Sequence, residues 1–172
     1  MDETQMMHGA DWQGEDLAGW YLSEKLNGCR AYWDGAQLWT RGGNAIAIPT
    51  SWANGLPRVE LDCELWAGRD GFERARLACQ YGRFTSAVRL MVFDAPRDGR
   101  FLDRQFVAHQ AIAGLPFAKA VRHTRCASTI DAVRMMHHVM QRGGEGIIAR
   151  RPDNHYRAGR TREILKLKGI EQ

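Results

Sequence analysis

Residues 20–40 of the chain read WYLSEKLNGCRAYWDGAQLWT. This stretch contains two aromatic, strand-like runs, and the turn sequence Asp34-Gly35 separates the second run from a further apolar segment. Asp-Gly between such segments is typical of a tight β-hairpin. The stretch therefore predicts antiparallel strands in the front half of the chain.

A further strand is predicted at residues 59–66, where apolar and polar residues alternate. One face of this strand carries Val59, Leu61, Cys63 and Leu65, and the other carries Glu60, Asp62, Glu64 and Trp66. Because successive side chains of a strand point to opposite faces, the carboxylates share one side. The apolar run 88–93, which ends before Asp94, predicts a buried strand that enters a loop.

Three segments are predicted to be helical, at residues 72–81, 102–113 and 129–142. The third has the best-defined ends. Ser128 and Asp131 have the spacing of an N-terminal capping box, and Gly143-Gly144 supplies a stop.

The remaining segments complete the predicted architecture. The connection from Pro49 to Pro57 has the length of a loop, and strands are predicted at residues 146–149 and 164–168. Lys166 and Lys168 share one face of the last strand. The pattern predicts an α+β fold in which helices are inserted between antiparallel strands.

The composition is that of one globular domain with a substantial core, because 44% of the 172 residues are hydrophobic and 26% are charged. No run approaches the roughly 18 apolar residues of a membrane span, and the N-terminus does not resemble a secretory signal. The four cysteines are widely spaced without a CxxC pair, which indicates reduced, mostly buried thiols. These features favour a soluble cytoplasmic chain and leave the export of a longer precursor open.

Positive charge is concentrated between Arg150 and Lys168. This segment contains seven basic residues against Asp153 and Glu163, whereas the whole chain has a net charge of +4. Dense cations are typical of a surface that binds phosphate or nucleic acid, because binding a polyanion releases its counterions. A solvated basic loop explains the charge equally well. The predicted nucleic-acid-binding residues are Arg150, Arg151, Arg157, Arg160 and Arg162.

Five short segments carry the residues suited to chemistry. In chain order they are Lys25-Leu26-Asn27-Gly28-Cys29-Arg30, Glu60 to Trp66, Val92-Phe93-Asp94, Glu145-Gly146-Ile147-Ile148 and Leu165-Lys166-Leu167-Lys168. Together they resemble the motifs of the covalent nucleotidyltransferase superfamily, which includes ATP-dependent DNA ligases, RNA ligases and mRNA capping enzymes. The first segment looks particularly like the nucleophile motif, KxDGxR, of the small bacterial ATP-dependent DNA ligases.

This resemblance implies an ATP-grasp-like nucleotidyltransferase (adenylation) domain over residues 19–172, after an N-terminal extension of residues 1–18. It implies an ATP-dependent DNA ligase of DNA repair, replication or recombination that uses ATP and Mg²⁺ and binds nicked double-stranded DNA as a monomer. Lys25 would attack the α-phosphate of ATP, release pyrophosphate and form lysyl-AMP. AMP would then pass to the 5′-phosphate of the nick.

A nucleophilic lysine must be neutral when it attacks. An unperturbed lysine side chain, with a pKa of ~10.4, is neutral in roughly one molecule in 2500 at pH 7. The site must therefore favour the neutral amine through neighbouring cations or burial. Arg30, a bound metal ion and an apolar wall are the candidates.

The resemblance also assigns the other site residues. Glu64 would accept hydrogen bonds from the ribose hydroxyls, Phe93 would stack on the adenine, and Glu145 would bind Mg²⁺. Lys166 and Lys168 would contact the α-phosphate, while Arg30 and Arg41 would contact phosphates or the nicked end. Without the motif context, Glu64 is equally an exposed acidic strand residue and Phe93 a core residue.

Two features depart from the family pattern. Asn27 replaces the commoner Asp of the nucleophile motif, and only four residues follow Lys168, where these enzymes normally continue into an OB-fold domain. We therefore expect a fragment or a minimal adenylation domain that lacks the OB fold. An RNA ligase or RNA-repair enzyme and a non-catalytic nick-binding module stay as alternatives.

Overall fold

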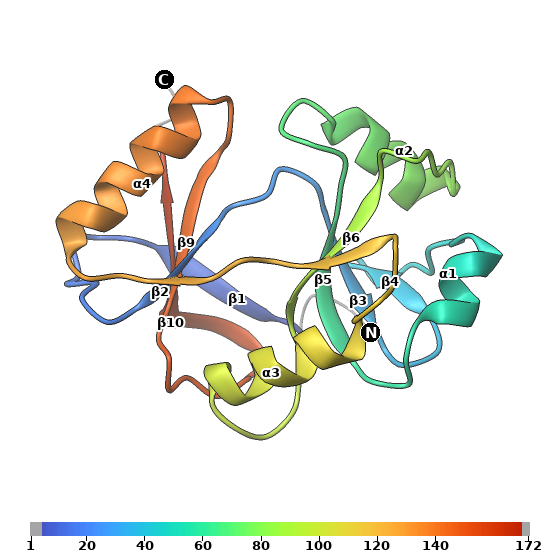
Figure 1. Ribbon diagram of the computed structural model, residues 1–172, viewed down its shortest axis with the longest axis horizontal. Coiled ribbons are helices and arrows are strands. Elements are labelled where there is room, and N and C mark those ends of the chain that lie inside the picture. The colour runs from blue at the N-terminus through green and yellow to red at the C-terminus, as the bar shows by residue number, and fades with distance from the viewer. Residues whose placement is uncertain (1–4, 170–172) are drawn as a thin grey trace.

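The structure, a computed structural model, describes residues 5–169 and contains two five-stranded sheets that lie side by side (Figure 1). Sheet A has the order β1 (Met7–Asp11), β10 (Gly159–Lys168), β9 (Gly146–Arg150), β2 (Tyr21–Glu24) and β8 (Thr124–Arg125). Sheet B has the order β4 (Leu38–Thr40), β3 (Cys29–Trp33), β5 (Leu61–Trp66), β6 (Arg89–Asp94) and β7 (Ala118–Ala120). The helices are α1 (Thr50–Gly55), α2 (Phe72–Tyr81), α3 (Phe101–Ala111) and α4 (Thr129–Gln141).

The predicted α+β class and the three predicted helices are confirmed. Helix α2 has the predicted bounds, and α3 and α4 differ from prediction by one or two residues at their ends. The side-chain oxygen of Ser128 accepts a hydrogen bond from the backbone N–H of Asp131 (3.3 Å), which satisfies one of the free donors at the start of α4.

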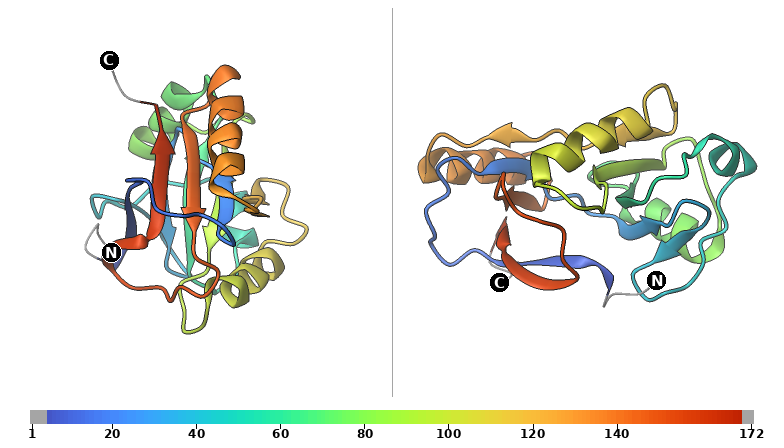
Figure 2. Two further views of the ribbon diagram at one scale, coloured as in Figure 1. Left: turned by 90° about the vertical axis from the view of Figure 1, so that its left-hand side faces the viewer. Right: turned by 90° about the horizontal axis from the view of Figure 1, so that it is seen from below.

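The strands are mostly antiparallel, as predicted, but both sheets also contain a parallel pair. Strand β1 runs parallel to β10, and β6 runs parallel to β7, so both sheets are mixed. Strand β1 lies within the segment that we assigned to an N-terminal extension, and it forms the edge of sheet A (Figure 2). Strand β10 also begins at Gly159, five residues before the predicted start.

Residues 50–55 form a short helix where we expected only a loop. The indole of Trp52 stacks on Phe117 with 4.7 Å between ring centres, and it meets Phe84 edge-on at 4.9 Å. A helix of six residues has little stability of its own, so this tertiary packing supports α1.

Each sheet has its own hydrophobic core. Helices α1 and α2 and the second half of α3 cover sheet B, whereas α4 packs against β9 and β10 of sheet A (Figure 2). No helix among residues 5–169 is both long and apolar enough to cross a membrane. The segments that connect the two sheets lie outside both cores and can therefore line a site between the sheets.

The nucleophile motif crosses from sheet A to sheet B. Residues 25–28 connect β2 to β3, and the backbone N–H of Lys25 donates to the carbonyl of Gly146 (2.9 Å). A Cβ atom at Gly28 would overlap the carbonyl oxygen of Leu65, so this close approach of two chains requires glycine. The crossing fixes the backbone on both sides of Lys25.

Candidate active site

A cavity of about 630 Å³ lies between the two sheets. Eight of the residues predicted from the sequence line it: Lys25, Arg30, Arg41, Glu64, Phe93, Glu145, Arg150 and Lys166. Six of them come from the five motif segments, and Lys25 and Lys166 are 141 positions apart. The fold therefore brings the separate motifs to one place.

Lys25 and Glu145 form an ion pair at one end of the cavity. The Nζ atom of Lys25 lies 2.5 Å from Oε1 of Glu145, and the side chains are 22% and 33% exposed. Glu145 directly precedes β9. The carbonyl of Gly146, the first residue of β9, accepts the hydrogen bond from the backbone N–H of Lys25. The pair is accessible to a ligand in the cavity.

Lys166 lies on β10 opposite Ile148 of β9, and it also lines the cavity. Partial burial lowers the pKa of Lys166, and the positive charge of Lys25 lowers it further. Two cations thus face one region of the cavity, which suits an anionic ligand. Lys168 is exposed and is not among the residues that line the cavity.

Arg30 and Glu64 are direct neighbours on adjacent strands of sheet B. Glu64 Oε1 accepts a hydrogen bond from the backbone N–H of Gly28 (3.2 Å). Burial raises the pKa of the Glu64 carboxyl to about 8, despite the opposing charges of Arg30 and Lys25. Glu64 is thus a cavity residue rather than part of an exposed acidic face.

The guanidinium of Arg30 is held by a buried carboxylate that sequence reasoning did not single out. Its Nε and Nη2 donate to the two oxygens of Asp62 (2.7 and 2.6 Å), and Nη2 also donates to the carbonyl of Met7 (2.9 Å). The hydroxyl of Tyr156 donates to Asp62 (2.6 Å). These contacts join β1, β3, β5 and the β9–β10 connection.

Phe93 is half-buried on β6 and lines the cavity. The Cζ atoms of Arg30 and Arg150 each lie 4.9 Å from the centre of its ring, within the range of cation–π contacts. Arg150 therefore differs from our expectation of a surface residue for nucleic acid. It is buried, because it ends a central strand of sheet A and points toward the cavity.

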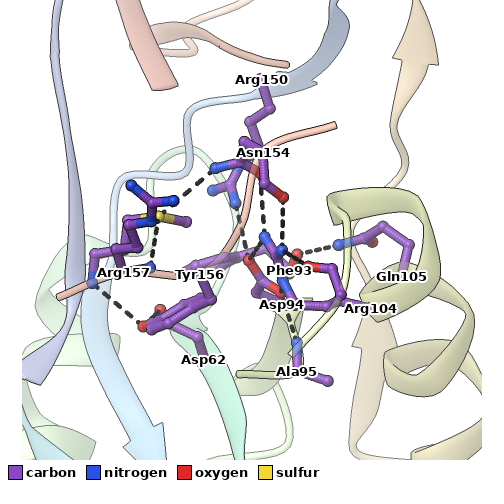
Figure 3. Close-up of polar contacts among 12 residues, drawn as sticks. Asp62, Phe93, Asp94, Ala95, Arg104, Gln105, Arg150, Asn154, Tyr156 and Arg157 are labelled. Carbon is purple, nitrogen blue, oxygen red and sulfur yellow. Dashed lines mark hydrogen bonds and ion pairs between the residues drawn. The ribbon is translucent and has the colours of Figure 1, made fainter. Parts of the chain in front are cut away.

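A buried polar network supports this end of the cavity (Figure 3). Arg104 of α3 is fully buried and donates to both carboxylate oxygens of Asp94 (2.8 and 3.1 Å). It also donates to the carbonyl of Gly99 (2.8 Å) and to the carbonyl and side-chain oxygens of Asn154 (2.8 and 3.1 Å). The sequence signal for Arg104 was its place on the same helix face as Phe101 and Ala108.

The other arginines of the predicted basic surface lie outside the cavity. Arg151, Arg157, Arg160 and Arg162 are all exposed. Arg162 pairs with Glu15 and donates to the carbonyl of Asp11 (3.3 Å). Arg41 is exposed at the cavity.

Comparison with known proteins shows which sequences and folds this chain resembles. No family model matches the chain. A DNA ligase of Haemophilus influenzae is 29% identical over 162 residues, which are 91% of this chain and 60% of the ligase. The chain thus spans about three-fifths of the length of that curated relative.

Solved structures show the same fold. A structure from a structure–function analysis of Lig E DNA ligases matches with a TM-score of 0.87 and 29% identity, over 97% of this chain and 69% of that one. Chlorella virus DNA ligase-adenylate (TM-score 0.80, 19% identity) and the ATP-dependent DNA ligase of bacteriophage T7 in complex with ATP (0.71, 13%) each match 96% of this chain and 69% of their own. These two identities support the fold alone.

The two sheets and the cavity between them have the fold of the nucleotidyltransferase domains of DNA ligases. Within that class the chain is similar to the adenylation domain of ATP-dependent DNA ligases, and the resemblance predicted from the five motifs is confirmed.

Proposed function

We propose that the chain is the adenylation domain of an ATP-dependent DNA ligase, which forms lysyl-AMP on Lys25 and passes AMP to the 5′-phosphate of a nick. The observation that carries this proposal is the ion pair between Lys25 and Glu145 in a cavity that residues of all five motifs line. A surface lysine in a turn would have no reason to meet a glutamate 120 positions away.

In this proposal the charges and aromatic surface of the cavity set the orientation of ATP. Lys25 and Lys166 attract the triphosphate at the end where their charges face the cavity, and Phe93 offers an aromatic surface for the base toward the other end. Glu64 then lies where it can hydrogen-bond to the ribose, and Arg30 lies next to it in the sheet. This order matches the roles that the resemblance implies.

The ion pair with Glu145 positions Lys25 in the cavity before reaction. In the reaction the neutral Nζ attacks the α-phosphorus, the bond to the bridging oxygen of the β-phosphate breaks, and pyrophosphate leaves. Lys25 must first give up a proton, for which Glu145 is the nearest acceptor. Lys166 remains positively charged beside the α-phosphate and stabilises the charge that develops there.

The carboxylate of Glu145 suits magnesium held jointly with substrate phosphates. Among residues 5–169 no three His, Cys, Asp or Glu side chains are grouped for metal binding, and Mg²⁺ commonly uses one or two carboxylates together with phosphates and water. When bound, the ion neutralises phosphate charge.

The exposed arginines of the β9–β10 connection and β10 supply the proposed contacts to nicked duplex DNA. Arg151, Arg157, Arg160 and Arg162 lie on the outside of the domain, where phosphate contacts need no rearrangement of the core. Because such contacts release counterions, binding to DNA falls steeply with added salt.

Labelled ATP tests the first step. The chain is incubated with α-³²P-ATP and Mg²⁺ and analysed by denaturing electrophoresis, and we expect a covalent adduct. Lys25→Ala and Lys25→Arg should give none, since neither offers an accessible neutral amine. Lys119→Ala, which changes an exposed lysine of β7, is the matched control and should keep the adduct.

Three outcomes contradict parts of the proposal. Absence of an adduct with the unaltered chain favours the non-catalytic module, and an adduct on Lys25→Ala places the nucleophile elsewhere. If the adduct forms, transfer of its AMP to a nicked DNA duplex and to a nicked RNA duplex decides the substrate. Preference for RNA would show that the RNA ligase alternative is correct.

A further inference from the structure

Arg150 is the buried cation whose hydrogen-bonding capacity is least used. Its side chain is 8% exposed, and its Nε has no hydrogen-bond partner among the residues that the structure describes. The nearest carboxylate oxygen, Oδ2 of Asp94, lies 3.7 Å from Nη1. Arg104 already donates two shorter hydrogen bonds to that carboxylate (Figure 3).

The buried Arg104 and the partly buried Arg30 provide the contrast. Arg104 makes five hydrogen bonds, and Arg30 makes a two-pronged bond with Asp62 and one with a carbonyl. A buried N–H donor without an acceptor costs more free energy than a satisfied one gains. Because Arg150 lines the cavity, a ligand there can supply the missing acceptor.

The position of Arg150 indicates which part of the ligand would supply the missing acceptor. Glu145 precedes β9 and Arg150 ends it, so their Cα atoms are separated by on the order of 15 Å along the strand. Glu145 pairs with Lys25, which marks the phosphate end. Arg150 lies beside Phe93, at the opposite end, where the proposed function places the base.

We propose that Arg150 contacts the base of the nucleotide and donates a hydrogen bond to a ring nitrogen of the adenine. The inference rests on the proposed function of the cavity. A guanidinium only donates hydrogen bonds. It therefore favours a base edge that presents an acceptor and disfavours an edge that presents N–H. Arg150 is then a specificity-determining residue for the nucleotide, and it is no part of the DNA-contacting surface.

Kinetics of adduct formation test the contact. Arg150→Met keeps an unbranched stem without donors, and Arg150→Lys keeps the charge. We expect Arg150→Met to raise KM for ATP about tenfold or more, the factor of one hydrogen bond to a charged donor, with kcat little changed. Arg134→Met on α4, whose side chain is 76% exposed, is the matched control and should leave both constants unchanged.

Purine analogues separate a base contact from a structural role. The unaltered chain should bind one of 1-deaza-, 3-deaza- and 7-deaza-ATP more weakly than ATP, and Arg150→Met should not distinguish that analogue from ATP. An unaltered chain that treats all three analogues like ATP overturns the inference without any variant. So does an Arg150→Met variant that weakens ATP and all three analogues equally.

The two proposals fail in different ways. If the unaltered chain forms no adduct, the proposed function fails. If it forms the adduct and Arg150→Met has an unchanged KM, the base contact alone fails. The methionine variant is expected to fold, because replacing a poorly paired buried guanidinium with an apolar side chain removes a desolvation cost; its thermal unfolding midpoint should therefore stay unchanged or rise.

Discussion

Each end of the cavity has a pair of oppositely charged side chains, but the two pairs differ in exposure and in the number of hydrogen bonds that they make. At the phosphate end, Lys25 and Glu145 make one contact and are 22% and 33% exposed. At the base end, Arg104 and Asp94 are both 0% exposed, and Arg104 makes five hydrogen bonds. The first pair can exchange partners, whereas the second is fixed.

This difference follows from solvation. A partly exposed ion pair contributes little to stability, so Lys25 can separate from Glu145 at little cost, as its proposed role requires. Separating a buried pair leaves an uncompensated charge away from water, which is strongly unfavourable. A nucleophile therefore belongs at the exposed end, and the groups that shape the pocket belong at the buried end.

The fixed end also joins the two sheets. Asp94 belongs to β6 of sheet B, whereas Asn154 lies in the connection between β9 and β10 of sheet A, and Arg104 bonds to both. Tyr156 of the same connection bonds to Asp62 of β5. The network thus sets the distance between the walls of the cavity as well as supporting Phe93 (Figure 3).

The largest expected effect comes from disrupting the buried polar network around Arg104. Arg104→Met removes the guanidinium and leaves the buried Asp94 with the backbone N–H of Ala95 and the more distant Arg150, so we expect the free energy of unfolding to fall by about 3–5 kcal/mol. Arg134→Met removes an exposed arginine that pairs with Asp131, and it should cost less than about 1 kcal/mol. Urea unfolding of both variants measures the difference. A loss below 1 kcal/mol for Arg104→Met would mean that the network does not hold the sheets together.

The sequence predicted the residues at the proposed phosphate end better than those of the buried network. The motif residues carry recognisable chemistry within a few positions of one another, and the cavity contains them because strands β2, β5, β6, β9 and β10 bring the motifs together. Lys168 is the exception, since the predicted shared face does not place it at the cavity.

Arg104 and β1 show what a local pattern cannot supply. A single arginine on a helix face gives no sign that it will meet an asparagine 50 positions away, and charged residues are rarely buried. Likewise, the pairing of β1 with β10 joins segments about 150 residues apart. The short helix α1 depends in the same way on the packing of Trp52 against Phe117.

A smaller effect tests whether the base end binds the base. Phe93→Ala removes the aromatic surface, and we expect ATP affinity to fall by about 1–3 kcal/mol, the usual contribution of base stacking. The control is Phe106→Ala on α3, whose side chain is 67% exposed and outside the cavity. Calorimetric titration with ATP and GTP measures affinity and the expected preference for ATP. Unchanged ATP affinity in a folded Phe93→Ala variant would make Phe93 a packing residue only.

The last effect depends on pH and concerns Glu64, which lies opposite Arg30 in sheet B and lines the cavity. Burial raises its pKa from 4.5 to about 8, so between these values the folded chain binds a proton that the unfolded chain has lost. The stabilisation is complete below about pH 4.5 and is lost as the pH rises through about 8, with a slope of up to about 1.4 kcal/mol per pH unit. Glu64→Gln should remove this slope.

The measurement is urea unfolding from pH 5 to pH 8 for the unaltered chain, Glu64→Gln and the exposed control Glu73→Gln. Glu73→Gln should keep the decline with pH, because Arg76 lowers the pKa of Glu73 below this window. Equal slopes for Glu64→Gln and the unaltered chain would show that Glu64 stays ionised, balanced by Arg30 and Lys25. In that case Glu64 would behave like the partly exposed charges Lys25 and Glu145, and not like the buried pair of Arg104 and Asp94.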